Sequence, residues 1–447
     1  MTTRRTSCRS AGALLVTLAL VLAACSSDGD QRGSTDGADT EQNSTQTVPT
    51  TAAASTTEAA PGTTEAAPTT VTNPPTTVVG VETLDTQQVV EALASDELNG
   101  RDNRTPGSLS AQELLVSQLA QFAEPAFPES DGNSGFLQPF DVGTNILAII
   151  PGGDLADEYV MIGAHYDHLG IDCRRVVSED DICNGATDNA TGVAEVMEIA
   201  RSIAADGPPR RSLIIALWDA EEDGLVGSSR YVNNPVVPLA QTVAYVNFDI
   251  HGANLLPSLA NWTILVGAET GGPHLVESAS TAIEASTLDT IMLSLLFGLG
   301  RSDHAVLVGA GVPSVFFTDS TGGCYHTVGD EVAVVDFAKL EQQIASADAL
   351  TRDLLSTESP PVLDRQAPPS TYDDAAQLLE LIAAAEPDFG LLGSEAQATS
   401  EQYLIELQGV VDAGPEAFDD AANGIVLVGV AGLVSALADG PCDAYIP

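Results

Sequence analysis

Basic residues are scarce in this sequence: 16 Lys and Arg face 63 Asp and Glu, which gives a formal net charge of -47. Nucleic-acid binding needs a basic surface that neutralises phosphates, and docking on anionic lipid needs positive charge as well. The composition therefore argues against both kinds of partner. It predicts a protein that self-repulsion keeps soluble, with attraction of basic peptides as a further option.

Long apolar runs are also few. The run at Ala11–Ala24 is too short to span a bilayer comfortably and follows an arginine-rich start, so residues 1–24 are predicted to be a signal peptide. It ends in Leu22–Cys25, which is similar to the lipobox of bacterial lipoproteins, where Cys25 would become the lipidated first residue. An ordinary secretory peptide with a chance cysteine is the alternative. The expected location is extracytoplasmic, with a lipid anchor to the bacterial cell membrane and release as a further option.

The sequence has six cysteines, and none of them has the CxxC spacing that is typical of zinc sites. Outside the signal peptide and Cys25, four remain: Cys173, Cys183, Cys324 and Cys442. An even number in an exported chain predicts disulfides, with three possible pairings. Cys173 with Cys183 is the favoured pair, because both lie in one short insertion. The pairing of Cys324 and Cys442 stays open.

The chain divides into segments of different composition. Residues 25–80 are rich in Thr, Ala, Ser and Pro and cannot bury enough apolar surface to fold, so they predict a disordered tether. A globular pattern begins near residue 81, and a proline-rich break follows at 358–370. We therefore expect a main domain at 81–357 and a helical C-terminal extension at 358–447.

Short apolar segments of strand length alternate with helical patterns through the main domain. Helices are expected at 86–94, 110–122 and 191–205. The strands are apolar on both faces, as in sheets that helices cover. This pattern predicts an α/β three-layer sandwich with a mixed, mainly parallel sheet. The expected strands are 145–150, 159–162, 213–218, 243–246 and 314–317.

Acidic and histidine side chains follow these strands or precede the helix at 191–205. Open α/β sheets bind ligands outside the carboxyl ends of their strands, so these side chains are expected to converge at one edge. Clustered carboxylates repel one another, and divalent cations offset this repulsion. The set is His165, Asp188, Glu221, Glu222, Asp249 and His326.

Imidazole with carboxylate is a ligand set that suits zinc. In two-metal sites the ions lie about 3.5–4 Å apart, which requires a bridging carboxylate. Glu221 and Glu222 are adjacent, and consecutive side chains at a strand end point in different directions. One of them could bind a metal while the other accepts the proton of the attacking water and passes it to the leaving amine.

At this point the motifs resemble a known family, the M28 zinc aminopeptidases. The resemblance covers about residues 81–357 and follows the same order along the chain. The matching segments are Gly163–His168, Gly185–Gly192, Trp218–Ser228, Val246–Asp249, Arg301–His304 and Tyr325–Thr327, preceded by Leu98–Arg101 and Thr105–Gly107.

The resemblance implies an aminopeptidase that uses two zinc ions. His165 and Asp249 would bind one ion, Glu222 and His326 the other, and Asp188 would bridge them.

Further roles also follow from the resemblance. Glu221 would be the general base, Tyr325 would stabilise the oxyanion, and Asp167 would hold the ring of His165. The segment from His165 to Asp188 is longer than the family leads one to expect. A glutaminyl cyclase, another amidohydrolase or carboxypeptidase, and a non-catalytic binding protein are the alternatives on the same fold.

Overall fold

The computed structural model describes residues 82–130, 132–171, 173, 181–298, 300–438 and 442, all within one compact unit. The predicted signal peptide, the lipidation site Cys25 and the tether at 25–80 lie outside the described residues. They stay predictions.

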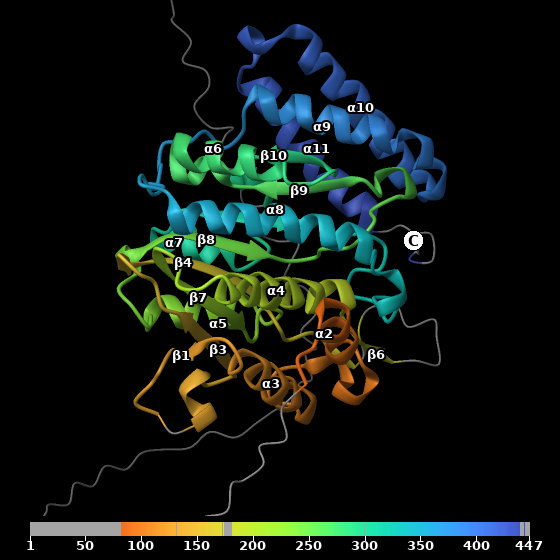
Figure 1. The fold of residues 1–447 in the computed structure, drawn as a ribbon. Coiled ribbons are helices and arrows are strands. Elements are labelled where there is room, and N and C mark those ends of the chain that lie inside the picture. The colour runs from red at the N-terminus through yellow and green to blue at the C-terminus, as the bar shows by residue number, and fades with distance from the viewer. Residues whose placement is uncertain are drawn as a thin grey trace, which may run out of the picture. The chain divides into compact units, whose positions relative to one another are not determined.

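The described residues form one mixed sheet of nine strands, in the order β1-β3-β7-β4-β8-β11-β9-β10, with β2 paired to β3 (Figure 1). The central strands β7, β4, β8 and β11 are parallel, and β3 and β9 flank them in antiparallel pairs. The strands are β1 (Glu124–Pro125), β2 (Leu137–Phe140), β3 (Gly143–Ile150), β4 (Leu155–His165), β7 (Arg211–Trp218), β8 (Thr242–Phe248), β9 (Trp262–Val266), β10 (Asp289–Leu293) and β11 (Ser314–Thr318). A separate hairpin pairs β5 (Gly170–Ile171) with β6 (Ile182–Cys183).

Helices cover both faces of the sheet, which confirms the predicted three-layer α/β sandwich. Along β3, Ile146 and Ala148 pack into one apolar cluster with α2, α3, α4, α6 and α8, whereas Leu147 packs on the other face with α5 and α7. This alternation is the two-residue period of a strand. The helices are α2 (Thr86–Leu93), α3 (Pro106–Leu119), α4 (Thr191–Ala205), α5 (Val226–Asn233), α6 (Gly272–Ile283), α7 (His304–Ala310) and α8 (Phe337–Ser356).

The C-terminal helices α9 (Tyr372–Ala385), α10 (Ser394–Ala413) and α11 (Asp420–Ala438) share a third apolar cluster with β9, β10 and β11. In Figure 1 α9 and α10 lie beyond β10, the last strand of the sheet order. By length and composition alone, α11 is apolar enough to cross a membrane, with a mean hydropathy of 1.7. One side of it nevertheless packs in this cluster, where Val430 and Leu433 are buried, while Val428 is 69% exposed.

Two differences from the predicted elements have local causes. Helix α3 begins at Pro106 rather than at residue 110, because Thr105 caps it by accepting a hydrogen bond from Ser108 N at 3.2 Å. Proline suits the first turn of a helix, where its missing N–H costs nothing. Strand β10 was not predicted, because it begins with the polar residues Asp289 and Thr290 and has only three consecutive apolar residues.

Candidate active site

The predicted site residues lie together at the carboxyl edge of the parallel strands. His165 is the last residue of β4, and Asp249 directly follows β8. Glu221 and Glu222 come just after β7, and all four side chains lie close to or inside the protein interior. Parallel strands end at the same edge of a sheet, so three neighbouring strands deliver these groups to one place.

Asp188 lies at the centre of this cluster, in the turn that precedes α4. Its Oδ1 lies 3.3 Å from Nε2 of His165, and its Oδ2 lies 3.3 Å from Nε2 of His326. These two distances show that the two oxygens of one carboxylate face two imidazoles on opposite sides, which is the arrangement that a bridging ligand requires. The peptide bond between Asp188 and Asn189 is cis.

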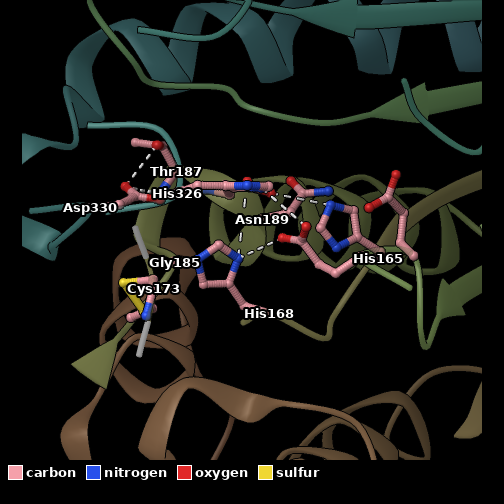
Figure 2. A network of polar contacts seen from close by, with 12 residues as sticks. His165, His168, Cys173, Gly185, Thr187, Asn189, His326 and Asp330 are labelled. Carbon is pink, nitrogen blue, oxygen red and sulfur yellow. Dashed lines mark hydrogen bonds and ion pairs between the residues drawn. A yellow bond between two sulfur atoms is a disulfide. The ribbon is translucent and has the colours of Figure 1, made fainter. Parts of the chain in front are cut away.

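Two groups of three side chains have donor atoms within 4.8 Å of one another. Both include Asp188, and Figure 2 shows the surrounding polar network. Imidazole nitrogens and carboxylate oxygens at this spacing fit the donor set and size of a divalent metal site. The groups are His165 with Asp188 and Asp249, and His168 with Asp188 and Glu222.

Two histidines compete for the second group. Nε2 of His326 lies 3.0 Å from Oε2 of Glu222, and Nδ1 of His168 lies 2.8 Å from Oε1 of the same carboxylate. The sequence analysis gave His168 no role in the site, so its contact with Glu222 was missed. The only signal in the sequence is its position three residues after His165 in the same loop. His168 Nε2 is buried without a hydrogen-bond partner among the described residues.

The charges of the cluster shift several pKa values. Burial raises the pKa of Asp188, but the neighbouring imidazoles of His165 and His326 outweigh it and hold that pKa well below its ordinary value. Burial and the charge of Asp188 also raise the pKa of Glu222, yet the hydrogen bond with His168 and the nearby imidazole of His326 bring it to about 2. Burial lowers the pKa of His326, but its two carboxylate partners raise it to about 10. The positive charge of the protonated imidazoles thus compensates the negative charge of the carboxylates, and a divalent cation would displace the imidazole protons.

Glu221 differs from Glu222 in this respect. Burial, together with the charges of Glu222 and Asp249, raises the pKa of Glu221 well above its ordinary value. Its side chain lines the same cavity as the cluster, beside Tyr325. The two adjacent glutamates therefore have opposite electrostatic environments, as a ligand and a proton acceptor would need.

Asp167 holds this pair of glutamates in place. Its carboxylate accepts hydrogen bonds from the backbone N–H of Glu221 at 3.1 Å and of Glu222 at 3.3 Å. Nδ1 of His165 lies 3.1 Å from the backbone oxygen of Asp167 and 3.6 Å from its carboxylate. The backbone of Asp167 makes the shorter contact with the ring, while its side chain fixes the glutamate loop.

The backbone is strained beside several of these residues. Positive φ angles, uncommon for residues with a side chain, occur at Ala220 (58°), Ile250 (60°) and His326 (56°). Ala220 precedes Glu221, and Ile250 follows Asp249. Such conformations cost about 1–3 kcal/mol each and persist where surrounding contacts enforce them, often at functional sites.

Tyr325, the predicted oxyanion-stabilising residue, is directly next to His326. Its ring stacks on that imidazole with the ring centroids 3.7 Å apart, and the guanidinium of Arg301 lies 5.6 Å from the Tyr325 ring centroid. Its neighbour Cys324 is joined by a disulfide to Cys442, which settles the pairing that the sequence left open. The other disulfide confirms the predicted pair in the insertion before Asp188.

Asp330 is a second residue whose contribution the sequence did not reveal. Its carboxylate accepts hydrogen bonds from the hydroxyl of Thr187 at 2.7 Å, from Thr187 N at 2.9 Å and from Asp188 N at 3.0 Å (Figure 2). The chain shortly after His326 therefore holds the turn that carries Asp188.

Arg101 organises the site from the side of α2. Its fully buried guanidinium donates hydrogen bonds to the backbone oxygens of Tyr166, Asn184 and Gly185, as well as Leu93. Burial lowers the pKa of Arg101 to about 10, which leaves it charged at neutral pH beside several site carboxylates. One side chain thus connects the loop after β4 to the loop that leads to Asp188.

The Arg101→Met variant is expected to lose about 3 kcal/mol or more of unfolding free energy, because buried carbonyl oxygens are left without donors. Urea unfolding of the full chain measures the change. Arg104→Met is the matched control, since Arg104 is exposed and its loss should change stability by no more than about 0.5 kcal/mol. Equal, small effects of the two substitutions would contradict the role given to Arg101.

The fold and the site define an α/β protein with a cluster of metal-binding side chains at the carboxyl edge of its sheet. Residues 145–348 match the model of Peptidase family M28.

Individual relatives match over limited lengths. A probable glutamate carboxypeptidase of Arabidopsis thaliana is 31% identical over 42% of this chain and 27% of its own length. Leupeptin-inactivating enzyme 1 of Streptomyces exfoliatus is 31% identical over 38% of this chain and 34% of its own. The chain thus spans about a third or less of these curated relatives. The LapA aminopeptidase of Legionella pneumophila has a solved structure that covers 62% of this chain and 72% of that one, with 20% identity and a TM-score of 0.49.

Proposed function

We propose that the protein is an aminopeptidase that releases N-terminal residues from peptides and uses two zinc ions. His165 and Asp249 would hold one ion and Glu222 and His326 the other, with Asp188 between them. The match of residues 145–348 to the model of Peptidase family M28 supports the reaction class, and the mixture of imidazole and carboxylate donors supports zinc.

The observation that carries this proposal is the position of Asp188. Its two carboxylate oxygens lie 3.3 Å from the imidazole nitrogens of His165 and His326, which come from different strands and loops. A carboxylate that only capped α4 would have no reason to lie between two imidazoles. The alternative use of His168 on the Glu222 side changes which ring binds the metal, but it leaves Asp188 between the two groups.

When bound, the zinc ions supply the Lewis acidity that lowers the pKa of a water molecule and polarises the scissile carbonyl. The side chains of this protein supply the rest of the chemistry. Glu221 accepts the proton of the attacking water and gives it to the leaving amine. The hydroxyl of Tyr325 donates a hydrogen bond to the oxyanion of the tetrahedral intermediate. Asp167 holds the loop that places Glu221 beside the cluster.

Hydrolysis of aminoacyl-4-nitroanilides by the purified full chain tests the proposal, with the N-acetylated substrates as matched controls. We expect cleavage of the free-amine substrates alone, loss of activity with chelator, and recovery when zinc is restored to two ions per chain. Activity that survives the chelator would contradict a metal mechanism. Faster cleavage of the acetylated substrates would indicate another amidohydrolase. Hydrolysis of N-acylated dipeptides with a free C-terminal carboxylate would indicate a carboxypeptidase, and cyclisation of N-terminal glutamine would indicate a glutaminyl cyclase.

A further inference from the structure

The C-terminal helices share a cavity with the metal-binding cluster. The cavity is lined by Asp188, Glu221 and His326 and also by side chains of α9 and α11. Its volume is about 90 Å³. One water needs roughly 10–15 Å³ by this kind of measure, so the cavity has room for an aliphatic side chain beside the reacting groups.

The part of the cavity wall that α9 and α11 provide, called the apolar end, consists of aliphatic side chains. Helix α9 contributes Leu378 and Leu381, and α11 contributes Val430, Leu433 and Leu437. All five are no more than 7% exposed, although they line the cavity. They belong to the same apolar cluster as residues of β9, β10 and β11. A group that enters this end therefore exchanges water for hydrocarbon on several sides.

Helix α9 is held rigidly against the edge strand β10. Gln377 accepts a hydrogen bond from Met292 N at 2.6 Å and donates one to Met292 O at 2.8 Å. Asp374 accepts from the N–H and the hydroxyl of Ser294 at 2.7 and 2.8 Å. These side chains take the place of a neighbouring strand at a sheet edge, so the wall that α9 provides is fixed relative to the sheet.

The chain beyond α11 is tethered to the site as well. The disulfide from Cys442 ends at Cys324, one residue before Tyr325 and two before His326. A covalent link thus joins the end of the helical extension to the loop that carries two site residues. The match to Peptidase family M28 ends at residue 348, so α9 and α11 lie outside the matched part.

We propose that α9 and α11 are the specificity wall of this active site and that the cavity accepts a large apolar side chain of the substrate, aliphatic or aromatic, next to the scissile bond. The inference rests on the proposed aminopeptidase function. Charged side chains are disfavoured, because a carboxylate or ammonium at the apolar end would lose its water without gaining a partner. Among the described residues that line the cavity, Arg301 is the only Lys or Arg. It is exposed and lies beside Tyr325.

The test compares the zinc-loaded full chain with Leu433→Trp, which fills the cavity from α11. For leucyl-4-nitroanilide we expect kcat/KM to fall about 10-fold or more, mainly through KM, while the value for alanyl-4-nitroanilide changes less than about 3-fold. Val428→Trp is the matched control, since Val428 is 69% exposed on the same helix and does not line this cavity. Leu433→Phe, a smaller change, replaces the Trp variant if its thermal unfolding shows that it does not fold.

A binding measurement separates this inference from the proposed function. Leucinol should raise the Tm of the wild-type protein more than alaninol does, and Leu433→Trp should abolish the difference. The inference is overturned if a folded Leu433→Trp variant keeps the wild-type ratio of leucyl to alanyl activity. It is also overturned if leucinol and alaninol act alike on the wild type, or if glutamyl or lysyl substrates are preferred. Absence of any free-amine hydrolysis would count against the proposed function, while the leucinol comparison would still decide the apolar cavity.

Discussion

The Glu221→Gln variant is expected to lose about 100- to 10,000-fold in kcat while it keeps its zinc. Glutamine has nearly the shape of glutamate but cannot accept a proton, and general acid–base catalysis contributes about this factor. Burial already raises the pKa of Glu221, which suits a group that takes up and returns a proton. Steady-state kinetics on leucyl-4-nitroanilide, with zinc content measured on the same sample, checks both parts of the expectation.

The neighbouring residue provides the control. Glu222→Gln removes a carboxylate that contacts two imidazoles, His326 at 3.0 Å and His168 at 2.8 Å, so it should lose zinc as well as activity. The two variants differ by one position and should separate a base from a ligand. Equal loss of zinc in both, or near-normal kcat in Glu221→Gln, would refute the assignment of Glu221 as the base.

The central strands could be predicted from sequence because they are buried on both faces and therefore apolar without interruption. The positions of His165, Glu221, Glu222 and Asp249 followed from the same pattern, since each comes at or just after the end of such a strand. Because parallel strands have their carboxyl ends at one edge of the sheet, residues that follow different strands in the sequence are expected to lie close together. The three-layer sandwich followed from the alternation of strands with amphipathic helices.

Contacts that depend on loop conformation could not be predicted. His168 turns back onto Glu222, and Asp330 reaches the Asp188 turn, through loops with no periodic pattern to interpret. Arg101 illustrates the same limit, because its role depends on three consecutive residues with positive φ, beginning at Asn99. At Gly100 a Cβ atom would lie 2.4 Å from Gly170 O, so only glycine allows the close approach.

The apolar wall of the cavity could not be predicted from the sequence for a different reason. The periodicity of α9 and α11 shows that each has an apolar side, but not which apolar surface it covers. In the structure the apolar sides of both helices pack in one cluster with residues of β9, β10 and β11, and polar side chains of α9 accept hydrogen bonds from the backbone of Met292 and Ser294. Specificity therefore depends on pairings between segments far apart in the sequence, whereas the metal-binding positions depend on strand ends.

Asp188→Asn is expected to reduce bound zinc from two ions per chain to one or none and to abolish most of the activity. An amide has only one oxygen to offer and carries no charge, so it cannot bridge two cations. Zinc should raise the Tm of the wild-type chain strongly, because a ligand at 1,000 times its Kd adds about 4 kcal/mol of stability. The variant should lose most of this rise. Thermal unfolding with chelator and with zinc, together with zinc content, measures the change without relying on activity.

Asp223→Asn is the matched control for charge, since Asp223 directly follows Glu222 but is exposed and belongs to neither group of metal-binding donors. It should keep two zinc ions and the zinc-induced rise in Tm. If Asp188→Asn also kept both, the two ions could not share Asp188, and the groups around His165 and Glu222 would have to act separately. The outcome decides whether the cluster works as one two-metal centre, because Asp188 is the only residue common to both groups among the described residues.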